Sequence, residues 1–405
     1  MLQYRVQPGD TVRRIANRCG IRPDAVYAAN PQLSRARHLA QGLVLSIPDS
    51  APQLYVLQPG DTLAELARRF GATAAQLLLA NPHLDPGRLH PGRLVVLPAA
   101  AACRIVDPNE EYGPRELYTD LHQLAVAYPF VRTGSIGRSV LGRPLPCVRI
   151  GDGPRRIHVN AAFHANEWVT SLLAMTFVED YARAIAHGEP FLGVDARGLA
   201  GRVTLWVVPM VNPDGVELSQ EGLYPRHPYY RQLLGWNRYS DRFFRWKANI
   251  RGVDLNDQFP AHWDEECARR GTEGPGPRDY PGPSPLSEPE AAAMAAHTRQ
   301  MDFDLAIALH TQGQEIYWNY RDYEPEEAAP LAVRLGVASG YRPVKLSGSD
   351  AGFKDWFIQE YRRPGFTIEA GIGVNPLPLE QFADIYDEVA PLLLEALLVV
   401  PSRSG

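Results

Sequence analysis

The sequence predicts an α/β protein in which a mixed, mostly parallel sheet is flanked by helices and is preceded by two small strand-helix-helix-strand modules. Two observations lead to this prediction. The first hundred residues repeat internally, and the remainder alternates apolar runs of strand length with helical stretches. Continuous apolar strands between helices are typical of a buried sheet. We therefore predict two modules, residues 1–50 and 51–100, and one larger domain, residues 101–405.

The two modules share their motifs. "YRVQPGDTVRRIANRCGI" at Tyr4 returns as "YVLQPGDTLAELARRFGA" at Tyr55, and "AANPQL" at Ala28 returns as "LANPHL" at Leu79. The offset is 51 residues in both cases (55 − 4; 79 − 28). Each copy predicts a short strand, a Pro-Gly turn, a helix that starts at Asp-Thr, a second short helix after "NP", and a closing apolar strand.

This pattern resembles the LysM module in both copies. The resemblance implies binding to glycans that contain N-acetylglucosamine, such as peptidoglycan or chitin. A small stabilising or dimerising domain without glycan affinity is the alternative, because the residue types in question also form turns and helix caps. The residues that the resemblance implies for the glycan groove are Gly9, Asp10, Thr11 and Asn30 in the first copy, and Gly60, Asp61, Thr62 and Asn81 in the second.

Composition and charge exclude several classes of function. Of the 405 residues, 45% are hydrophobic and 21% are charged, the formal net charge is −5, and no block of basic residues stands out. We therefore expect no nucleic-acid partner. We also expect no membrane span and see no signal peptide at the start, "MLQYRVQPGD". The four cysteines, Cys19, Cys103, Cys147 and Cys267, lack the spacing of a thiolate metal site and are expected to be reduced.

Polar residues follow the predicted strands of the larger domain at the point where each strand ends. His164, Asn212, His310 and Glu369 all lie at such carboxyl ends, where the ligands of α/β sheets gather. The predicted strands are residues 155–163, 202–211, 303–310 and 365–370, and the first of them leads into a predicted helix over residues 169–185.

His164 and Glu167 lie three residues apart at the start of that helix, so both side chains can point at one spot. A catalytic zinc site takes three protein ligands and keeps one position open, and His310 offers the third ligand from another strand. Glu369 is an acid in an apolar strand, where an unpaired carboxylate is costly, so use as a general base explains it best. For the first two residues, a core histidine beside a capping glutamate is the alternative.

A second His-x-x-Glu pair, His262 and Glu265, has a different setting. It lies in a polar stretch rich in proline and glycine, with no apolar strand before it. We predict an exposed loop there rather than a metal site.

The order of "HxNE", "NPDG", "GVDLN", a strand-terminal histidine and a strand glutamate resembles the zinc metallocarboxypeptidases of the carboxypeptidase A superfamily, over about residues 110–400. The resemblance implies one Zn²⁺ per chain with His164, Glu167 and His310 as ligands, and Glu369 as general base. It also implies a positive group that stabilises the oxyanion.

Lys247 in "WKAN" stands where that superfamily usually has the catalytic arginine. Lysine occurs elsewhere only at Lys345 and Lys354, so a lysine at this point is informative: it offers a point charge in place of a planar fork. Arg251 is the second candidate for this role, and an ordinary surface lysine is the alternative for Lys247.

The sequence departs from the superfamily at the position that holds the substrate's terminal carboxylate. Where "GVD.NRN" is usual, this chain has "GVDLNDQF", so Asn256 remains but Asp257 replaces the arginine. An aspartate repels a carboxylate and attracts an ammonium group, such as that of a diamino acid; a structural hydrogen bond in a turn is the alternative. An Asp257→Arg exchange is expected to shift preference toward free terminal carboxylates.

Together with the LysM-like repeats, these departures resemble the γ-D-glutamyl-L-diamino acid endopeptidase I group, which cuts peptidoglycan stem peptides between D-glutamate and the diamino acid (diaminopimelate or lysine). A zinc carboxypeptidase acting on other peptides and a catalytically inactive LysM glycan-binding protein are the alternatives. The substrate implies a cell-wall, extracellular or spore location, although without a visible signal peptide a cytoplasmic recycling enzyme is a further possibility.

Overall fold

The fold was analysed in a computed structural model of the chain. The structure describes residues 105–400 without a break. Before them it describes residues 2–6, 11–12, 15–16, 26–27, 29–30, 33, 39, 42–47, 53–58, 61–63, 66, 77–78, 80–86 and 89–97. The chain divides into two compact units, Met1–Asp107 with Tyr118–Pro129, and Pro108–Leu117 with Phe130–Gly405. The finer division at residues 50 and 100 stays a prediction.

Each N-terminal module closes with an antiparallel strand pair. Strand β1 (Leu2–Arg5) pairs with β2 (Val44–Ile47), and β3 (Gln53–Val56) pairs with β4 (Leu94–Leu97). Small apolar clusters lie beside these pairs, around Ile15, Val26 and Leu45 in the first module and around Leu66, Leu77 and Val95 in the second. The predicted opening and closing strands are therefore confirmed.

Asn30 and Asn81 hold equivalent places in the two modules. The side chain of Asn30 donates to the carbonyls of Val26 and Ser46 and accepts from the Ser46 amide, at 2.6–2.8 Å. Asn81 makes the same three contacts with Leu77 and Val96. Asn30 is 1% exposed, so its amide connects the closing strand to the module core, and its role in glycan binding stays a prediction.

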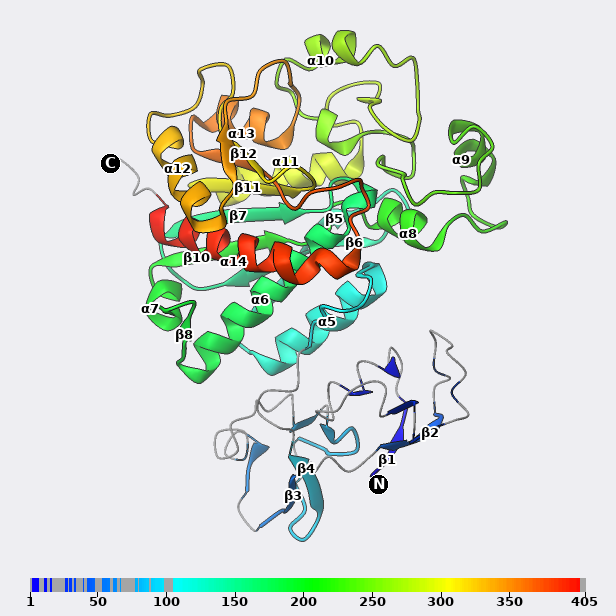
Figure 1. The fold of residues 1–405 in the computed structure, drawn as a ribbon, viewed down its shortest axis with the longest axis vertical. Helices are drawn as coiled ribbons and strands as arrows, with labels where there is room; N and C mark the ends of the chain where they lie inside the picture. The colour runs from blue at the N-terminus through cyan, green and yellow to red at the C-terminus, as the bar shows by residue number, and fades with distance from the viewer. Residues whose placement is uncertain are drawn as a thin grey trace. The chain divides into compact units, whose positions relative to one another are not determined.

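The larger domain is built on one eight-stranded mixed sheet (Figure 1). Four neighbouring pairs are parallel, among them β7 with β10 and β7 with β11, and three are antiparallel. In spatial order the strands are β13 (Arg342–Val344), β12 (Glu315–Tyr317), β14 (Gly365–Glu369), β11 (Leu305–His310), β7 (Arg155–Ala161), β10 (Val203–Val208), β6 (Pro144–Ile150) and β5 (Arg132–Arg138). The predicted α/β class with a mixed sheet is confirmed.

Helices cover both faces of this sheet (Figure 1). Helices α11 and α13 pack with the alanines of β11 on one face, and α6 with α14 covers the other. The helices are α5 (Pro114–Ala127), α6 (Val169–His187), α7 (Ala196–Ala200), α8 (Pro213–Glu221), α9 (Tyr230–Trp236), α10 (Trp263–Arg270), α11 (Pro289–Met301), α12 (Ala328–Ser339), α13 (Phe353–Tyr361) and α14 (Phe382–Val399), with short 3₁₀ turns η1 (Ala165–Glu167), η2 (Leu255–Asp257) and η3 (Leu379–Gln381). A small ribbon joins β8 (Pro190–Phe191) to β9 (Val194–Asp195).

Helix α6 shows why the predicted helix forms. Its first fourteen residues are all buried, and nine of them are apolar, as expected for a helix between a sheet and a second helix. The helix ends at Gly188, whose φ of 68° suits the left-handed cap. In the part of the chain that the structure describes, no helix is long and apolar enough to cross a membrane. Cys147 and Cys267 are free thiols, whereas Cys19 and Cys103 lie outside the described residues.

Candidate active site

The site begins where strand β7 ends. The chain turns at Ala162, whose φ is 48°, and His164 follows in an extended conformation directly before η1. Asn212 secures this turn from the end of β10: its Nδ2 donates to the Phe163 carbonyl at 3.2 Å, and its Oδ1 accepts from the Gly215 amide at 3.1 Å. The asparagine of "NPDG" therefore caps α8 and fixes the backbone beside His164.

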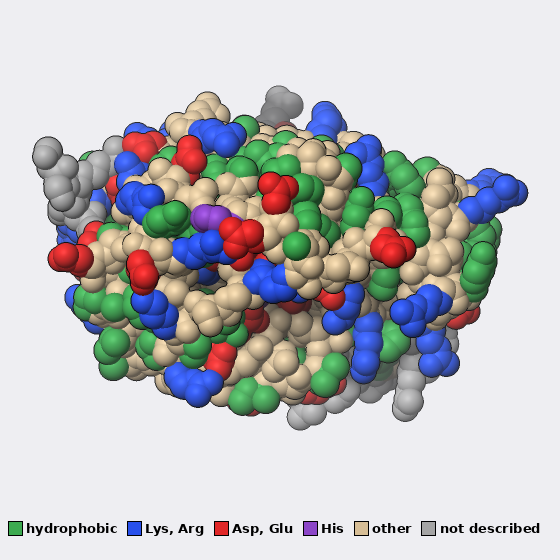
Figure 2. All heavy atoms as spheres, turned by 90° about the horizontal axis from the view of Figure 1, so that it is seen from above, with side chains coloured by type: hydrophobic (Ala, Val, Ile, Leu, Met, Phe, Trp, Pro, Cys, Tyr) green, Lys and Arg blue, Asp and Glu red, His purple; other side chains and the backbone are tan. Residues whose placement is uncertain are grey.

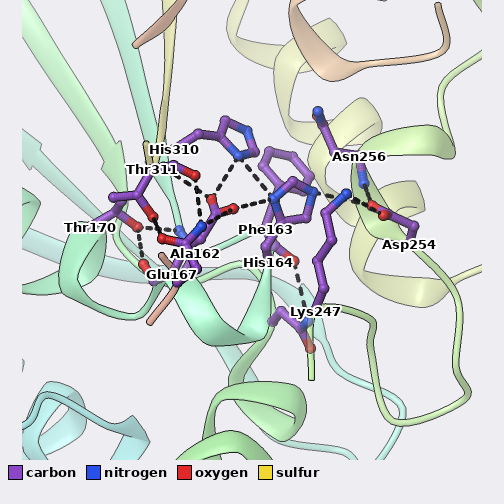
Figure 3. Close-up of polar contacts among 12 residues, drawn as sticks. Ala162, Phe163, His164, Glu167, Thr170, Lys247, Asp254, Asn256, His310 and Thr311 are labelled. Carbon is purple, nitrogen blue, oxygen red and sulfur yellow. Dashed lines mark hydrogen bonds and ion pairs between the residues drawn. The ribbon is translucent and has the colours of Figure 1, made fainter. Parts of the chain in front are cut away.

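Three predicted ligands converge from two strand ends (Figure 3). The Nδ1 atom of His164 lies 2.9 Å from Glu167 Oε1, and the Nδ1 atom of His310 lies 3.0 Å from Glu167 Oε2. The two Nδ1 atoms are 3.1 Å apart. All three residues are buried, and among the described residues they form the one group of three or more such side chains close enough to share an ion.

This donor set fits a zinc ion. Two imidazoles and a carboxylate are typical ligands of catalytic zinc, and a fourth position stays open for water or substrate. Tetrahedral ligands at about 2.0–2.1 Å from zinc are roughly 3.3 Å apart, and the observed separations of 2.9–3.1 Å approach that spacing. Two facing Nδ1 atoms share at most one hydrogen bond, whereas a cation accepts a lone pair from each.

The charges of the three ligands depend on one another. Burial alone would lower the pKa of His164, but Glu167 and Asp254 raise that pKa to about 9. At His310 burial prevails and the pKa is lowered. Although burial opposes it, the two histidines hold the pKa of Glu167 well below its usual range. A metal needs deprotonated imidazoles, so it competes with the proton on His164 and binds less well as pH falls.

Asp254 holds His164 from the side remote from the ligand atom. Its Oδ1 lies 3.1 Å from His164 Nε2, and its Oδ2 lies 2.7 Å from Lys247 Nζ (Figure 3). A carboxylate on the remote nitrogen of a ligating histidine fixes the ring orientation and raises its basicity. Asp254 could not be predicted as a site residue, because "GVDLN" alone does not distinguish it from an aspartate that caps a turn.

Lys247 and Arg251 lie in different settings. Lys247 contacts Asp254, its side chain is 17% exposed, and Asp254 raises its pKa despite burial, so it is a cation. Arg251 lies 3.5 Å from the Tyr229 hydroxyl and 3.7 Å from Glu288, with 43% of its side chain exposed. Of the two predicted candidates, Lys247 is the one joined through Asp254 to the cluster of His164, Glu167 and His310.

The strand register places Glu369 beside His310. Glu369 ends β14 and is the direct neighbour of His310 on the parallel strand β11, while Glu315 of β12 is its neighbour on the other side. Burial, and then the charge of Glu167, raise the pKa of Glu369 to about 8. A carboxyl group with a pKa near neutrality is suited to accept a proton and return it.

Asp257 is already paired. It is buried and forms a two-point ion pair with Arg270 of α10, at 2.8 Å between Oδ2 and Nε and 2.9 Å between Oδ1 and a terminal nitrogen. The ion pair is consistent with the alternative of a structural role for Asp257. Recognition of a substrate ammonium group by Asp257 stays a prediction. Asn256, next to it in η2, accepts a hydrogen bond from the Phe353 amide at 3.2 Å.

Asn375 is a site residue that the sequence analysis missed. Its Nδ2 donates to Glu167 Oε1 at 3.2 Å and to the Thr311 carbonyl at 2.8 Å, while its Oδ1 accepts from the Thr311 hydroxyl at 2.7 Å. The Thr311 amide donates to Glu167 Oε2 at 3.3 Å. Each carboxylate oxygen thus receives one donor, and a flipped Asn375 amide would place its oxygen against two acceptors. Asn375 therefore fixes the plane of the Glu167 carboxylate.

An Asn375→Ala exchange is expected to raise the zinc dissociation constant about 10–100-fold, the usual effect of removing a residue that orients a ligand. The measurement is competition with a chromogenic chelator. Asn319→Ala, on a buried asparagine that bonds the Leu346 backbone instead, is the matched control and should leave the zinc constant within threefold. Equal zinc affinity in both variants would show that Asn375 only supports its loop.

The remaining predicted residues lie apart from this cluster. His262 contacts the Tyr320 hydroxyl at 2.9 Å and Glu265 pairs with Arg321. This pair lies at the start of helix α10, so the predicted exposed loop is wrong at this point. In the modules, Asp61 accepts a hydrogen bond from the Gln58 amide at 2.7 Å, as a turn residue does. Thr11 and Thr62 are described, whereas Gly9, Asp10 and Gly60 lie outside the described residues.

A buried His-Glu-His cluster with a glutamate on the neighbouring strand defines a metallopeptidase. The chain belongs to the zinc carboxypeptidase family, which it matches over residues 117–371. Its first hundred residues match the LysM domain twice, over residues 4–48 and 55–98. The predicted family and the predicted repeats are confirmed, and the protein is a hydrolase.

Two relatives match nearly three quarters of the chain. The chain is 46% identical over 294 residues to γ-D-glutamyl-L-diamino acid endopeptidase 1 of Lysinibacillus sphaericus, spanning 73% of this chain and 74% of that protein. It is 40% identical over 296 residues to the uncharacterized protein YqgT of Bacillus subtilis (strain 168), spanning 72% and 78%. Bovine thrombin-activatable fibrinolysis inhibitor shares the fold, with a TM-score of 0.56 at 19% identity over 72% of this chain and 98% of that one.

Proposed function

We propose that this protein is a zinc-dependent peptidoglycan hydrolase that cleaves the γ-D-glutamyl–diamino acid bond of stem peptides, with diaminopimelate or lysine as the diamino acid. The observation that carries the proposal is the 46% identity to an endopeptidase named for that bond. The two LysM domains support it, because they suit an enzyme whose substrate is attached to a glycan that contains N-acetylglucosamine.

The metal would be one zinc ion held by His164, Glu167 and His310. Bound there, zinc supplies Lewis-acid chemistry, since it makes a water molecule more acidic and polarises the scissile carbonyl. Asp254 keeps the His164 ring in place from the remote nitrogen, and Asn375 keeps the Glu167 carboxylate in place. These two contacts preorganise the three ligand atoms.

Glu369 and Lys247 would carry out the remaining chemistry. Glu369 takes the proton of the attacking water and returns it to the leaving amine of the diamino acid, so one carboxyl group is base and then acid. Lys247 places a fixed positive charge next to the cluster and stabilises the negative charge that develops on the carbonyl oxygen. Asn256 and Asp257 would contact the substrate beyond the scissile bond, and Arg251 remains the second candidate for the oxyanion.

Digestion of defined muropeptides tests the proposed function. Disaccharide tri-, tetra- and pentapeptides are incubated with the full chain, and the products are identified by mass. Cleavage of the γ-bond gives a disaccharide peptide that ends in D-glutamate and a fragment that begins with the diamino acid. Chelation should stop the reaction and zinc should restore it. Release of the C-terminal residue instead would identify a carboxypeptidase, and bound zinc without any cleavage would identify a glycan-binding protein with an inactive peptidase domain.

Because Asp257 is paired with Arg270, a test of its role in substrate specificity has to preserve the surroundings of Arg270. A single Asp257→Arg exchange would bring two guanidinium groups together at a buried position, which is strongly destabilising. An Asp257→Asn exchange instead removes the negative charge and keeps an oxygen acceptor for Arg270, which stays paired with Glu266. We expect it to lower kcat/KM on γ-glutamyl-diamino acid substrates roughly 10-fold, by the loss of one ammonium contact, and to raise it on peptides with a free carboxylate at that place. Unchanged ratios would leave Asp257 a structural role alone.

The domain arrangement fits this function. We propose that residues 1–50 and 51–100 bind the glycan and that residues 101–405 hydrolyse the attached peptide. Thr11, Asp61 and Thr62, with the glycines and Asp10 of the same loops, would line the glycan grooves. Asn30 and Asn81 would shape these grooves from within. A cell-wall or other extracellular location, including a spore, suits such a protein.

A further inference from the structure

Residues 222–246 carry a net positive charge, whereas the chain as a whole is negatively charged. The stretch "GLYPRHPYYRQLLGWNRYSDRFFRW" contains five arginines and a single acidic residue, Asp241, which gives +4 (5 − 1) in a chain of net charge −5. No two of the arginines are adjacent, so no basic run marks them in the sequence. The five are Arg226, Arg231, Arg238, Arg242 and Arg245.

All five side chains are exposed. Throughout residues 105–400, which the structure describes in full, none of the five forms an ion pair with a carboxylate. Arginines elsewhere in the domain commonly do, as Arg143 does with Asp214 and Arg270 with Asp257. No direct ion pair therefore neutralises these arginines, and a segment with excess positive charge attracts anionic partners.

Exposed aromatic rings lie among these arginines. Tyr224 is 50% exposed, Tyr239 is 84% exposed and Phe244 is 47% exposed, and the Arg245 guanidinium lies 5.5 Å from the centre of the Phe244 ring. Figure 2 shows basic and hydrophobic side chains together on the side where α9 lies in Figure 1. Aromatic faces suit the apolar faces of sugar rings, and guanidinium groups suit carboxylates.

Buried residues of the same segment pack against the backbone of the candidate active site. Leu233, Phe243 and Trp246 are buried in one cluster with Ala165 of η1, the turn that carries Glu167. The segment then leads into Lys247, whose carbonyl accepts a hydrogen bond from the Ala165 amide at 2.9 Å. A polymer bound by the exposed side would consequently be held next to the metal-binding cluster.

We propose that this arginine surface, formed by the five arginines with Tyr224, Tyr239 and Phe244, binds the peptidoglycan polymer through the carboxylates of its stem peptides and through its sugar rings. The inference rests on the proposed function. It gives the enzyme a second means of binding the polymer, in addition to the LysM domains. Attachment near the active site raises the local concentration of stem peptides. The rate of hydrolysis should therefore increase on the insoluble polymer and not on a small soluble fragment.

The test compares two double variants of the full chain with equal charge change. Arg238→Glu/Arg242→Glu alters the arginine surface, and Arg132→Glu/Arg202→Glu alters two exposed arginines on β5 and directly before β10, which also form no ion pair within residues 105–400. Initial rates are measured on sacculi freed of phosphate polymers and on a soluble disaccharide tripeptide. For the first variant we expect the loss on sacculi to exceed the loss on the soluble peptide at least fivefold. For the second we expect equal, small changes on both, and melting curves verify that each variant folds.

Equal losses on both substrates, or the same result for both variants, would overturn the proposal. Two further arms identify the partner's chemistry. Sacculi whose carboxylates have been converted to amides should show no advantage of wild type over the variant, and Arg238→Gln/Arg242→Gln should lose about half as much binding energy as the glutamate variant. An advantage of wild type seen only on sacculi that retain phosphate polymers would assign the surface to those polymers and refute the proposal.

The two proposals fail differently. If the wild-type chain cleaves no soluble muropeptide, the proposed function fails, yet the arginine surface is still tested by pelleting the full chain with sacculi. There we expect the bound fraction of wild type to exceed that of Arg238→Glu/Arg242→Glu at low ionic strength, and the difference to shrink as salt screens the charges. Equal bound fractions at low salt would refute the surface independently of catalysis.

Discussion

Replacing Glu369 with glutamine is expected to lower kcat on stem peptides by about 10²–10⁴-fold, the usual contribution of a positioned general base. Glutamine keeps the shape of the side chain on β14 but cannot take a proton. Zinc content should stay at one ion per chain, because Glu369 lies beside His310 without being one of the three clustered ligands. Initial rates measured together with metal content test this expectation.

The pH profile separates a base from a merely structural glutamate. Burial and Glu167 raise the pKa of Glu369 to about 8, and a bound dication would lower it. A base acts only when deprotonated, so the wild-type rate should fall as pH drops through this pKa, at a pH below 8. Glu315→Gln is the matched control: Glu315 also raises the pKa of Glu369, so its removal should shift the acid limb to lower pH and leave kcat within tenfold. A Glu369→Gln variant within tenfold of wild type would place proton transfer elsewhere.

A His310→Ala exchange should cost the protein its metal. If three ligands share a zinc-binding free energy on the order of 10–16 kcal/mol, each contributes roughly 3–5 kcal/mol, so the zinc dissociation constant should rise about 10²–10⁴-fold. Activity should vanish at zinc concentrations that saturate wild type and should return in part at high zinc. Calorimetric titration of the metal-free chain measures the constant.

The control for this exchange is another buried histidine. His297 of α11 is 6% exposed and packs against Trp206 and Phe303, so His297→Ala also empties a buried site and should lower the melting temperature. It should leave zinc affinity unchanged. Loss of zinc in the His297 variant, or retention of wild-type affinity in the His310 variant, would contradict the assignment of the ligands.

Sequence patterns predicted the centre of the sheet better than its edges. Strands β7, β10, β11 and β14 are largely buried, and each lies within a few residues of its predicted bounds. Strand β5, "RTGSIGR", lies at the sheet edge with mostly exposed side chains, so it has neither an apolar run nor an alternating pattern. Strand β12 has three residues, too few for any periodicity to be read.

The same contrast holds for the site. His164, Glu167, His310 and Glu369 follow or end strands, and parallel strands bring their carboxyl ends together, so their proximity could be predicted. Asp254 and Asn375 reach the cluster from 90 and 208 residues away along the chain. Their loops carry no periodic pattern, and only the folded backbone brings them to His164 and Glu167.

The pairing of Asp257 with Arg270 depends on a helix that was not predicted. Helix α10, "WDEECARR", is only eight residues long and lies in a stretch rich in proline and glycine, so the surrounding sequence indicated a loop. The sequence shows the negative charge of Asp257. It does not show that Arg270 is already paired with that charge.

The side-by-side placement of His310 and Glu369 has an evolutionary consequence. Because the hydrogen-bonded ladder of β11 and β14 sets their separation, a shift of one residue in register would turn one of the two side chains to the opposite face. The spacing of the proposed ligand and the proposed base is therefore inherited with the sheet. The loops around it can lengthen, change charge or acquire attachment surfaces without disturbing that spacing, which lets one hydrolytic centre be adapted to many polymers.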